Sequence, residues 1–69
     1  MQFVVEEVHA ARPWAIRNKS GNQHASKFFT TQAEAEIFAQ AMNKAWEQME
    51  RKSFTRAIQW AEQALTPQA

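Results

Sequence analysis

The chain has no cysteine, no aspartate and no tyrosine, one glycine, two prolines and no long apolar run. Without cysteine it can form neither a disulfide framework nor a thiolate metal site, which fits a reducing compartment. Its first apolar stretch includes acids and no basic leader, and no run approaches the ~20 apolar residues of a membrane span. We therefore expect a cytoplasmic protein without membrane contact.

Apolar and aromatic residues are plentiful by contrast. The 69 residues are 45% hydrophobic and include three tryptophans, which excludes a disordered chain. A chain of this length forms one domain, and so small a domain buries only about 60% of the surface that its unfolded chain exposes. Some of the aromatic surface could therefore be buried against a partner.

The N-terminal half has three segments with the composition of β-strands. The first, QFVVEEV, is apolar and β-branched. The second, PWAIRN, alternates in a way that predicts an inner face of Trp14 and Ile16. A polar loop around Gly21 predicts a hairpin into the third, HASKFF, where Phe28 and Phe29 must face opposite sides of the sheet. The sequence leaves the register of this third strand open.

A helix is expected over residues 31–51. Thr31 and Glu34 have the spacing of a capping box, in which the hydroxyl accepts from an orphan amide and the carboxylate reaches back to the cap. No glycine or proline interrupts the segment. One broad apolar face is expected to contain Ala35, Phe38, Ala41, Met42, Ala45, Trp46 and Met49.

A second helix is expected over residues 53–66, with an apolar stripe centred roughly 130° away from the first. We prefer a bend, with Ser53 capping a helix that folds back, but one long dimerising helix stays open because no glycine marks the bend. The predicted fold is one α+β domain, 1–69. A three-stranded antiparallel meander over residues 1–30 packs on the long amphipathic helix, and the C-terminal helix follows.

Three motifs suggest a known design: W-A-I-R from Trp14, the hairpin at Gly21, and F-T-T-Q-A-E-A from Phe29. Together they resemble the arm-type DNA-binding domain at the N-terminus of phage and transposon tyrosine integrases. They are also similar to short uncharacterised bacterial domains with the same strand, hairpin and capped helix. The resemblance covers residues 12–46. It implies a three-stranded sheet that enters the DNA major groove, and it implies no recombinase activity, because the integrase catalytic region is replaced.

The resemblance also suggests DNA-contacting residues. It places Arg17 and Lys27 on the sheet face away from the helix, toward DNA, and Lys19 at a phosphate; Arg12 is the fourth basic residue of this half. The net charge is only +1, divided as +2 over residues 1–30 and −1 over the rest. Alternating charges are also typical of a sheet face exposed to solvent. The basic residues could therefore bind nucleic acid or simply keep the surface soluble, and both interpretations stay open.

The second helix offers a different kind of site. Trp60 lies off the centre of its apolar stripe and could form an exposed interface patch with Phe54 and Leu65. Alternatively, Trp60 packs on Trp46 in a helical hairpin. The first arrangement would suit a protein-binding surface.

Catalytic and metal sites are not expected. His9 or His24 could pair with Glu6 or Glu7 as a metal site or an acid and base, but neither histidine has ligand spacing. We expect no enzyme, cofactor, metal or small-molecule substrate. The leading hypothesis is a phage or mobile-element protein that binds double-stranded DNA through its sheet, as a homodimer through the C-terminal helix. The alternative is a phage- or plasmid-encoded inhibitor or adaptor that binds a host protein complex.

Overall fold

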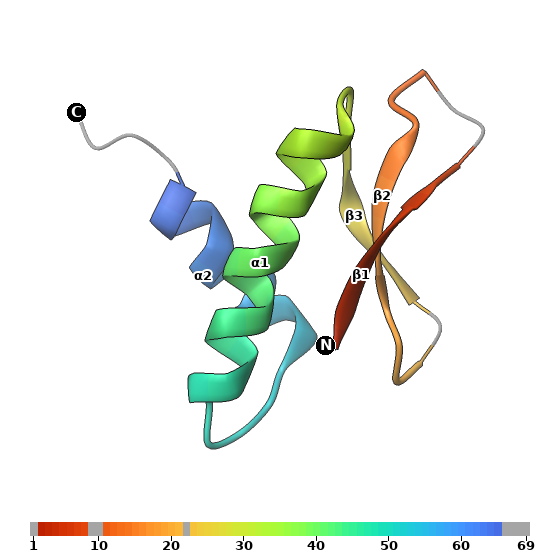
Figure 1. The fold of residues 1–69 in the computed structure, drawn as a ribbon. Coiled ribbons are helices and arrows are strands. Elements are labelled where there is room, and N and C mark those ends of the chain that lie inside the picture. Colours follow the sequence, from red (N-terminus) through yellow and green to blue (C-terminus); the bar gives the residue numbers. More distant parts are fainter. Residues whose placement is uncertain (1, 9–10, 22, 66–69) are drawn as a thin grey trace.

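The computed structural model describes residues 2–8, 11–21 and 23–65. It contains one three-stranded antiparallel sheet, with the strands in chain order, and two helices (Figure 1). The predicted α+β architecture is therefore confirmed. The elements are β1 (Phe3–Glu7), β2 (Trp14–Asn18), β3 (Gln23–Phe29), α1 (Gln32–Gln48) and α2 (Phe54–Leu65).

The central strand β2 turns its predicted inner face toward the helices. Ile16 is fully buried and Trp14 packs against the same core. Trp14 pairs with Phe29, which is also buried, whereas Phe28 is 41% exposed. This settles the open register of β3, because Phe29 and not Phe28 faces the helices. The register shifts between Ala15 and Arg17, which marks a bulge in the pairing with β3.

Helix α1 begins at the predicted cap but ends earlier than expected. Thr31 accepts a hydrogen bond from the Glu34 amide at 3.3 Å. The helix ends at Gln48 because Met49 takes an extended conformation, φ −79° and ψ 133°. Lys52 Nζ donates to the Met49 carbonyl at 3.2 Å and also to the Trp46 carbonyl, so a cation satisfies carbonyls at the end of the helix.

Helix α2 folds back on α1, as preferred from the sequence, and the single long helix is excluded. Ser53 Oγ accepts a hydrogen bond from the Arg56 amide at 3.3 Å and caps α2. Ala57 and Ala61 are fully buried, and these small side chains let the two helices approach closely. Helix α1 contacts both the sheet and α2, and Figure 1 shows it between them.

Phe3 joins the sheet to both helices. This side chain is 1% exposed. Its ring stacks on Phe54 of α2 at 5.6 Å and meets Trp46 of α1 edge-on at 5.3 Å. Aromatic pairs in these geometries add to the free energy gained from burial alone. The first strand is therefore anchored in the core of the domain.

Neither helix in the described part of the chain has the length and apolar character required to cross a membrane.

Candidate binding surfaces

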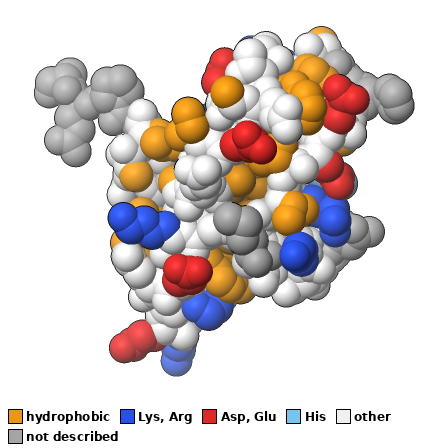
Figure 2. All heavy atoms as spheres, viewed as in Figure 1, with side chains coloured by type: hydrophobic (Ala, Val, Ile, Leu, Met, Phe, Trp, Pro, Cys, Tyr) orange, Lys and Arg blue, Asp and Glu red, His pale blue; other side chains and the backbone are white. Residues whose placement is uncertain are grey.

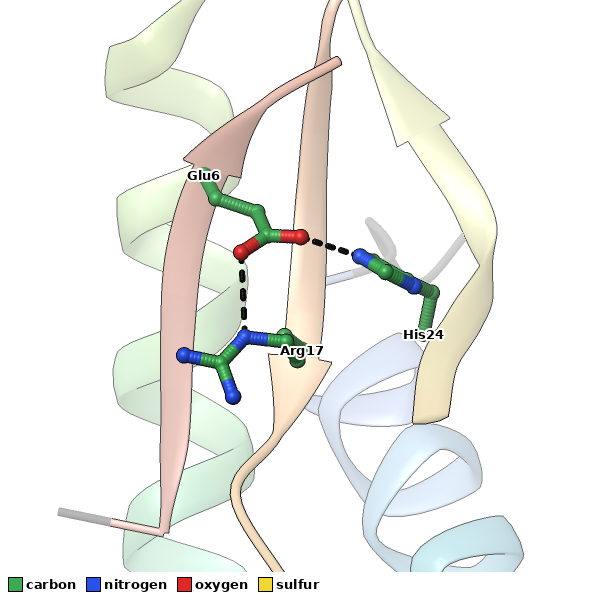
Figure 3. Close-up of polar contacts among 3 residues, drawn as sticks. All are labelled: Glu6, Arg17 and His24. Atoms are coloured by element: carbon green, nitrogen blue, oxygen red, sulfur yellow. Dashed lines mark hydrogen bonds and ion pairs between the residues drawn. The ribbon is translucent and has the colours of Figure 1, made fainter. Parts of the chain in front are cut away.

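Three polar side chains, one from each strand, meet on the sheet face away from the helices (Figure 3). Arg17 Nε donates to Glu6 Oε2 at 3.0 Å, and His24 Nε2 contacts Glu6 Oε1. The strand pairing explains this contact. Arg17 pairs with His24 on β3 and with Val4 on β1, and Glu6 lies two residues after Val4 on the same face of the sheet. Glu6 thus bridges all three strands.

The contacts of Glu6 change its ionisation. The hydrogen bond from His24 lowers the pKa of Glu6 below its ordinary value of 4.5, partial desolvation opposes this shift, and Arg17 lowers the pKa further. Glu6 therefore carries its negative charge at neutral pH. This arrangement suits a cross-strand ionic contact, and the cluster includes no hydroxyl or thiol nucleophile.

The suggested histidine sites are only partly formed. His24 does reach Glu6, as one version of that hypothesis required. His9 lies outside the described residues. Among the residues that the structure describes, no group of three or more histidine or acidic side chains could hold a metal ion.

The expected DNA-contacting residues lie on different faces. Arg17 is on the outer face, bound to Glu6. Lys27 shares the orientation of Ala25 and the buried Phe29, and its Nζ lies 5.3 Å from the ring centroid of Phe38 on α1. The expectation that Arg17 and Lys27 share the face away from the helix is therefore wrong. The physical reason is the register of β3.

The other two basic residues are also far apart. Arg12 precedes β2 and Lys19 follows it, and both are exposed. The five-residue strand β2 lies between them and by itself spans roughly 17 Å. Figure 2 shows acidic and basic side chains interspersed on the face in view, without a wide area of one sign. The four basic residues therefore do not form one patch.

The expected protein-binding patch is only partly exposed. Trp60 is 46% exposed and Leu65 43%. Phe54 instead packs against the core, so the patch with all three residues exposed is wrong. Phe54 and not Trp60 is the α2 aromatic that joins the cluster around Trp46 and Phe3. The two rings part because positions six apart on a helix point about 120° away from each other.

Trp60 borders a hollow that the sequence did not indicate. It measures about 360 Å³ and lies where the inter-helix loop meets α2. The apolar lining comes from Trp60 and Met49. The charged part of the lining comes from Glu50, Arg51 and Arg56. The sequence did not indicate that these residues lie together, because the direction in which α2 folds back, and not a local spacing, brings the loop beside α2. The full lining is Gln48, Met49, Glu50, Arg51, Arg56 and Trp60.

A second hollow, of about 280 Å³, lies between β1 and α1. On α1 its lining follows one helical stripe, with spacing i, i+3, i+4 and i+7. That spacing is the signal that could have found it. The lining residues are Phe3, Val4, Val5, Glu36, Ala39, Gln40 and Asn43.

Comparison of the chain with protein-family models, with curated proteins and with solved structures finds no match in any of the three.

Proposed function

We propose that this protein is a non-catalytic protein-binding module that docks through Trp60 and the hollow beside it. The observation that supports this most directly is a tryptophan left 46% exposed on α2 while the core is completed by other aromatics. Arg51 and Arg56 line the same hollow. Tryptophan and arginine are the residue types most enriched among binding hot spots.

The chemistry of this surface favours a partner segment with an apolar side chain next to an acidic one. Met49 and Trp60 offer the apolar part of the hollow, and two arginines against Glu50 leave it with a positive balance. Arginine pairs with a carboxylate in a bidentate way that is directional. The more specific form that we propose is a phage- or plasmid-encoded inhibitor or adaptor, acting on a host protein complex in the cytoplasm. The net charge of only +1 favours a protein partner over a nucleic acid, and the mobile-element origin rests on the resemblance alone.

The test compares Trp60→Ala with Ile37→Ala, which removes another exposed apolar side chain, on α1. Proteins retained from a cytoplasmic extract by the immobilised wild type would be identified, and the best would be purified for calorimetric titration. A hot-spot loss of about 2 kcal/mol would weaken binding about 30-fold for Trp60→Ala. We expect Ile37→Ala to stay within about 2-fold. Equal affinities for both variants would contradict the proposal.

Double-stranded DNA is the second candidate partner. The resemblance to arm-type domains favours it, and Arg12 and Lys19 are exposed. Contacts from so few cations would give weak binding with a steep salt dependence. The test is fluorescence anisotropy of a mixed-sequence duplex at about 50 and about 200 mM salt. The double variant Arg12→Glu with Lys19→Glu should abolish such binding, whereas Trp60→Ala should not.

The proposed homodimer would form through α2, and it can be tested on the same variants. A second copy covering Trp60 would make the wild type sediment as a dimer, and Trp60→Ala would then shift it to the monomer. A monomeric wild type at tens of micromolar would remove the homodimer and leave Trp60 accessible to a different partner.

A further inference from the structure

The open edge of β1 presents unpaired backbone groups beside α1. Among the described residues, β1 is paired with β2 alone. The Lys19 amide donates to the Gln2 carbonyl at 3.0 Å, and the Val8 amide donates to the Pro13 carbonyl at 2.6 Å. Even-numbered residues of this strand therefore turn their backbone groups toward β2. Since these directions alternate along a strand, Phe3, Val5 and Glu7 turn theirs toward the open edge.

The side chain of Asn43 on α1 already acts as a short neighbour to this edge. The Phe3 amide donates to Asn43 Oδ1 at 2.9 Å, and Asn43 Nδ2 donates to the Phe3 carbonyl at 3.1 Å. The side-chain amide thus makes the two contacts that an adjacent strand would make. Within the described part of the chain, no side chain does the same for Val5 or Glu7.

The hollow along this edge has room for a side chain. Ala39 and Val5 contribute apolar surface, and the small side chain of Ala39 leaves the space open. Asn43 lines one end of the hollow and Glu36, two helical turns earlier on α1, lines the other. An aliphatic side chain from an added strand would therefore enter between the β1 backbone and α1.

The charge around the hollow is negative. Glu36 lines it, and Glu7 ends the strand whose edge is open. Neither carboxylate forms an ion pair with a described residue, and none of the described lining residues is basic. A positively charged ligand would complement this surface.

We propose that β1 binds an extended, basic segment of a partner protein as a fourth strand. The segment would pair with the Val5 amide and carbonyl and insert an aliphatic side chain into the hollow. Side chains two residues apart share one face of a strand, so lysine or arginine two residues from the aliphatic one would face Glu36 and Glu7. Backbone pairing supplies affinity and the side chains supply specificity in this binding mode.

A second copy of the chain fits the edge less well. Self-pairing of two β1 edges would bring together two copies of an acidic segment, with Glu6 and Glu7 on each strand. Like charges across a strand pair are destabilising. The binding site is separate from the Trp60 surface, so this inference stands without the proposed function.

The probe is a fluorescein-labelled peptide with a central valine, lysine two residues away on each side and threonine elsewhere. Its affinity would be measured by fluorescence anisotropy with the full chain, and amide exchange of Val5 would be followed by NMR. We expect saturable binding with slowed exchange of the Val5 amide. A peptide with glutamate in place of lysine should bind at least 10-fold more weakly, as should one with an N-methylated valine.

Matched variants test the site itself. Glu36→Lys should weaken binding at least 5-fold, whereas Glu47→Lys, at another exposed position of α1, and Trp60→Ala should leave it within 2-fold. Val5→Pro removes the outward amide and should abolish binding while retaining the ladder to β2. If that variant does not fold, Glu36→Lys and the N-methylated peptide still decide. Equal losses of peptide affinity in Glu36→Lys and Glu47→Lys would overturn the proposal. So would slow exchange of the Val5 amide in the absence of peptide, if it came from self-association of the protein.

Discussion

The two edge strands of the sheet are protected by different means. On β3, Lys27 places a charge at the edge and extends over the Phe38 ring. A lysine on an edge strand is a common obstacle to unwanted strand pairing. On β1, which has no lysine, Asn43 from α1 pairs with the Phe3 backbone instead. A charge protects an edge by repulsion, whereas an amide protects only the groups that it binds, so β1 remains partly available to a partner.

The largest difference between the edges is expected in the core. Phe3→Ala on β1 should lower the free energy of unfolding by about 3–5 kcal/mol, because the ring packs on both helices. Phe28→Ala, which truncates an exposed ring on β3, should cost much less. Urea denaturation of both variants measures the difference. Similar losses would show that β1 is not the better anchored edge.

A smaller loss is expected when the amide bridge is removed. Asn43→Ala leaves the amide and carbonyl of Phe3 without their partner, which should cost about 1–3 kcal/mol. In a domain of this size each kcal/mol lowers Tm by about 4–8 °C. Lys44→Ala, at the neighbouring exposed position, is the control for general effects on α1. The amide of Phe3 should also exchange faster in Asn43→Ala, and unchanged exchange would argue against the bridge.

Removing the charge from the other edge should affect association more than stability. An exposed cation–π contact contributes about 0.5–1 kcal/mol, so Lys27→Val should change the free energy of unfolding little. Without the lysine, the β3 edges of two molecules should pair, so we expect the Lys27→Val variant to self-associate. Sedimentation at increasing protein concentration measures this association. Lys27→Arg retains the charge and should stay as the wild type. A strictly monomeric Lys27→Val would mean that other features protect this edge.

The smallest expected effect is on the pH dependence of stability. It arises at Glu6 of β1, which contacts His24 on the other edge strand. The pKa of Glu6 is lowered by its hydrogen bond with His24 and by Arg17. A carboxylate with a lowered pKa in the folded state stabilises that state above its unfolded pKa, and the contribution is lost as pH falls through the folded value. The wild type should therefore lose stability below about pH 4.5 more than Glu6→Gln does. The measurement is the urea midpoint of each protein as a function of pH. Equal changes in midpoint for the two proteins below pH 4.5 would refute this prediction.

Local signals in the sequence were sufficient for the elements themselves. Thr31 and Ser53 cap the two helices as their positions predicted, and Trp14 and Ile16 face inward as their alternation predicted. These features depend on residues a few positions apart. The sequence therefore predicted the number, the order and most of the boundaries of the elements.

The sites were predicted less well because they depend on contacts between distant segments. The adjacent Phe28 and Phe29 allowed two registers, and the choice between them decided the face of Lys27. The bridge between Asn43 and Phe3 joins residues 40 positions apart, and no local pattern signals it. Likewise, the direction in which α2 folds back decided that Phe54 is buried and Trp60 is exposed.

The contact of Glu6 with Arg17 and His24 also bears on how the strands find their correct alignment. A slip of β1 by one position would reverse every side chain on that strand. Glu6 would then be driven into the apolar layer under α1, and Phe3 would be moved into water. Arg17 and His24 would lose their common carboxylate at the same time. A slip of one residue would thus incur all three penalties together, so this contact disfavours that misregistered form as well as stabilising the correctly paired sheet.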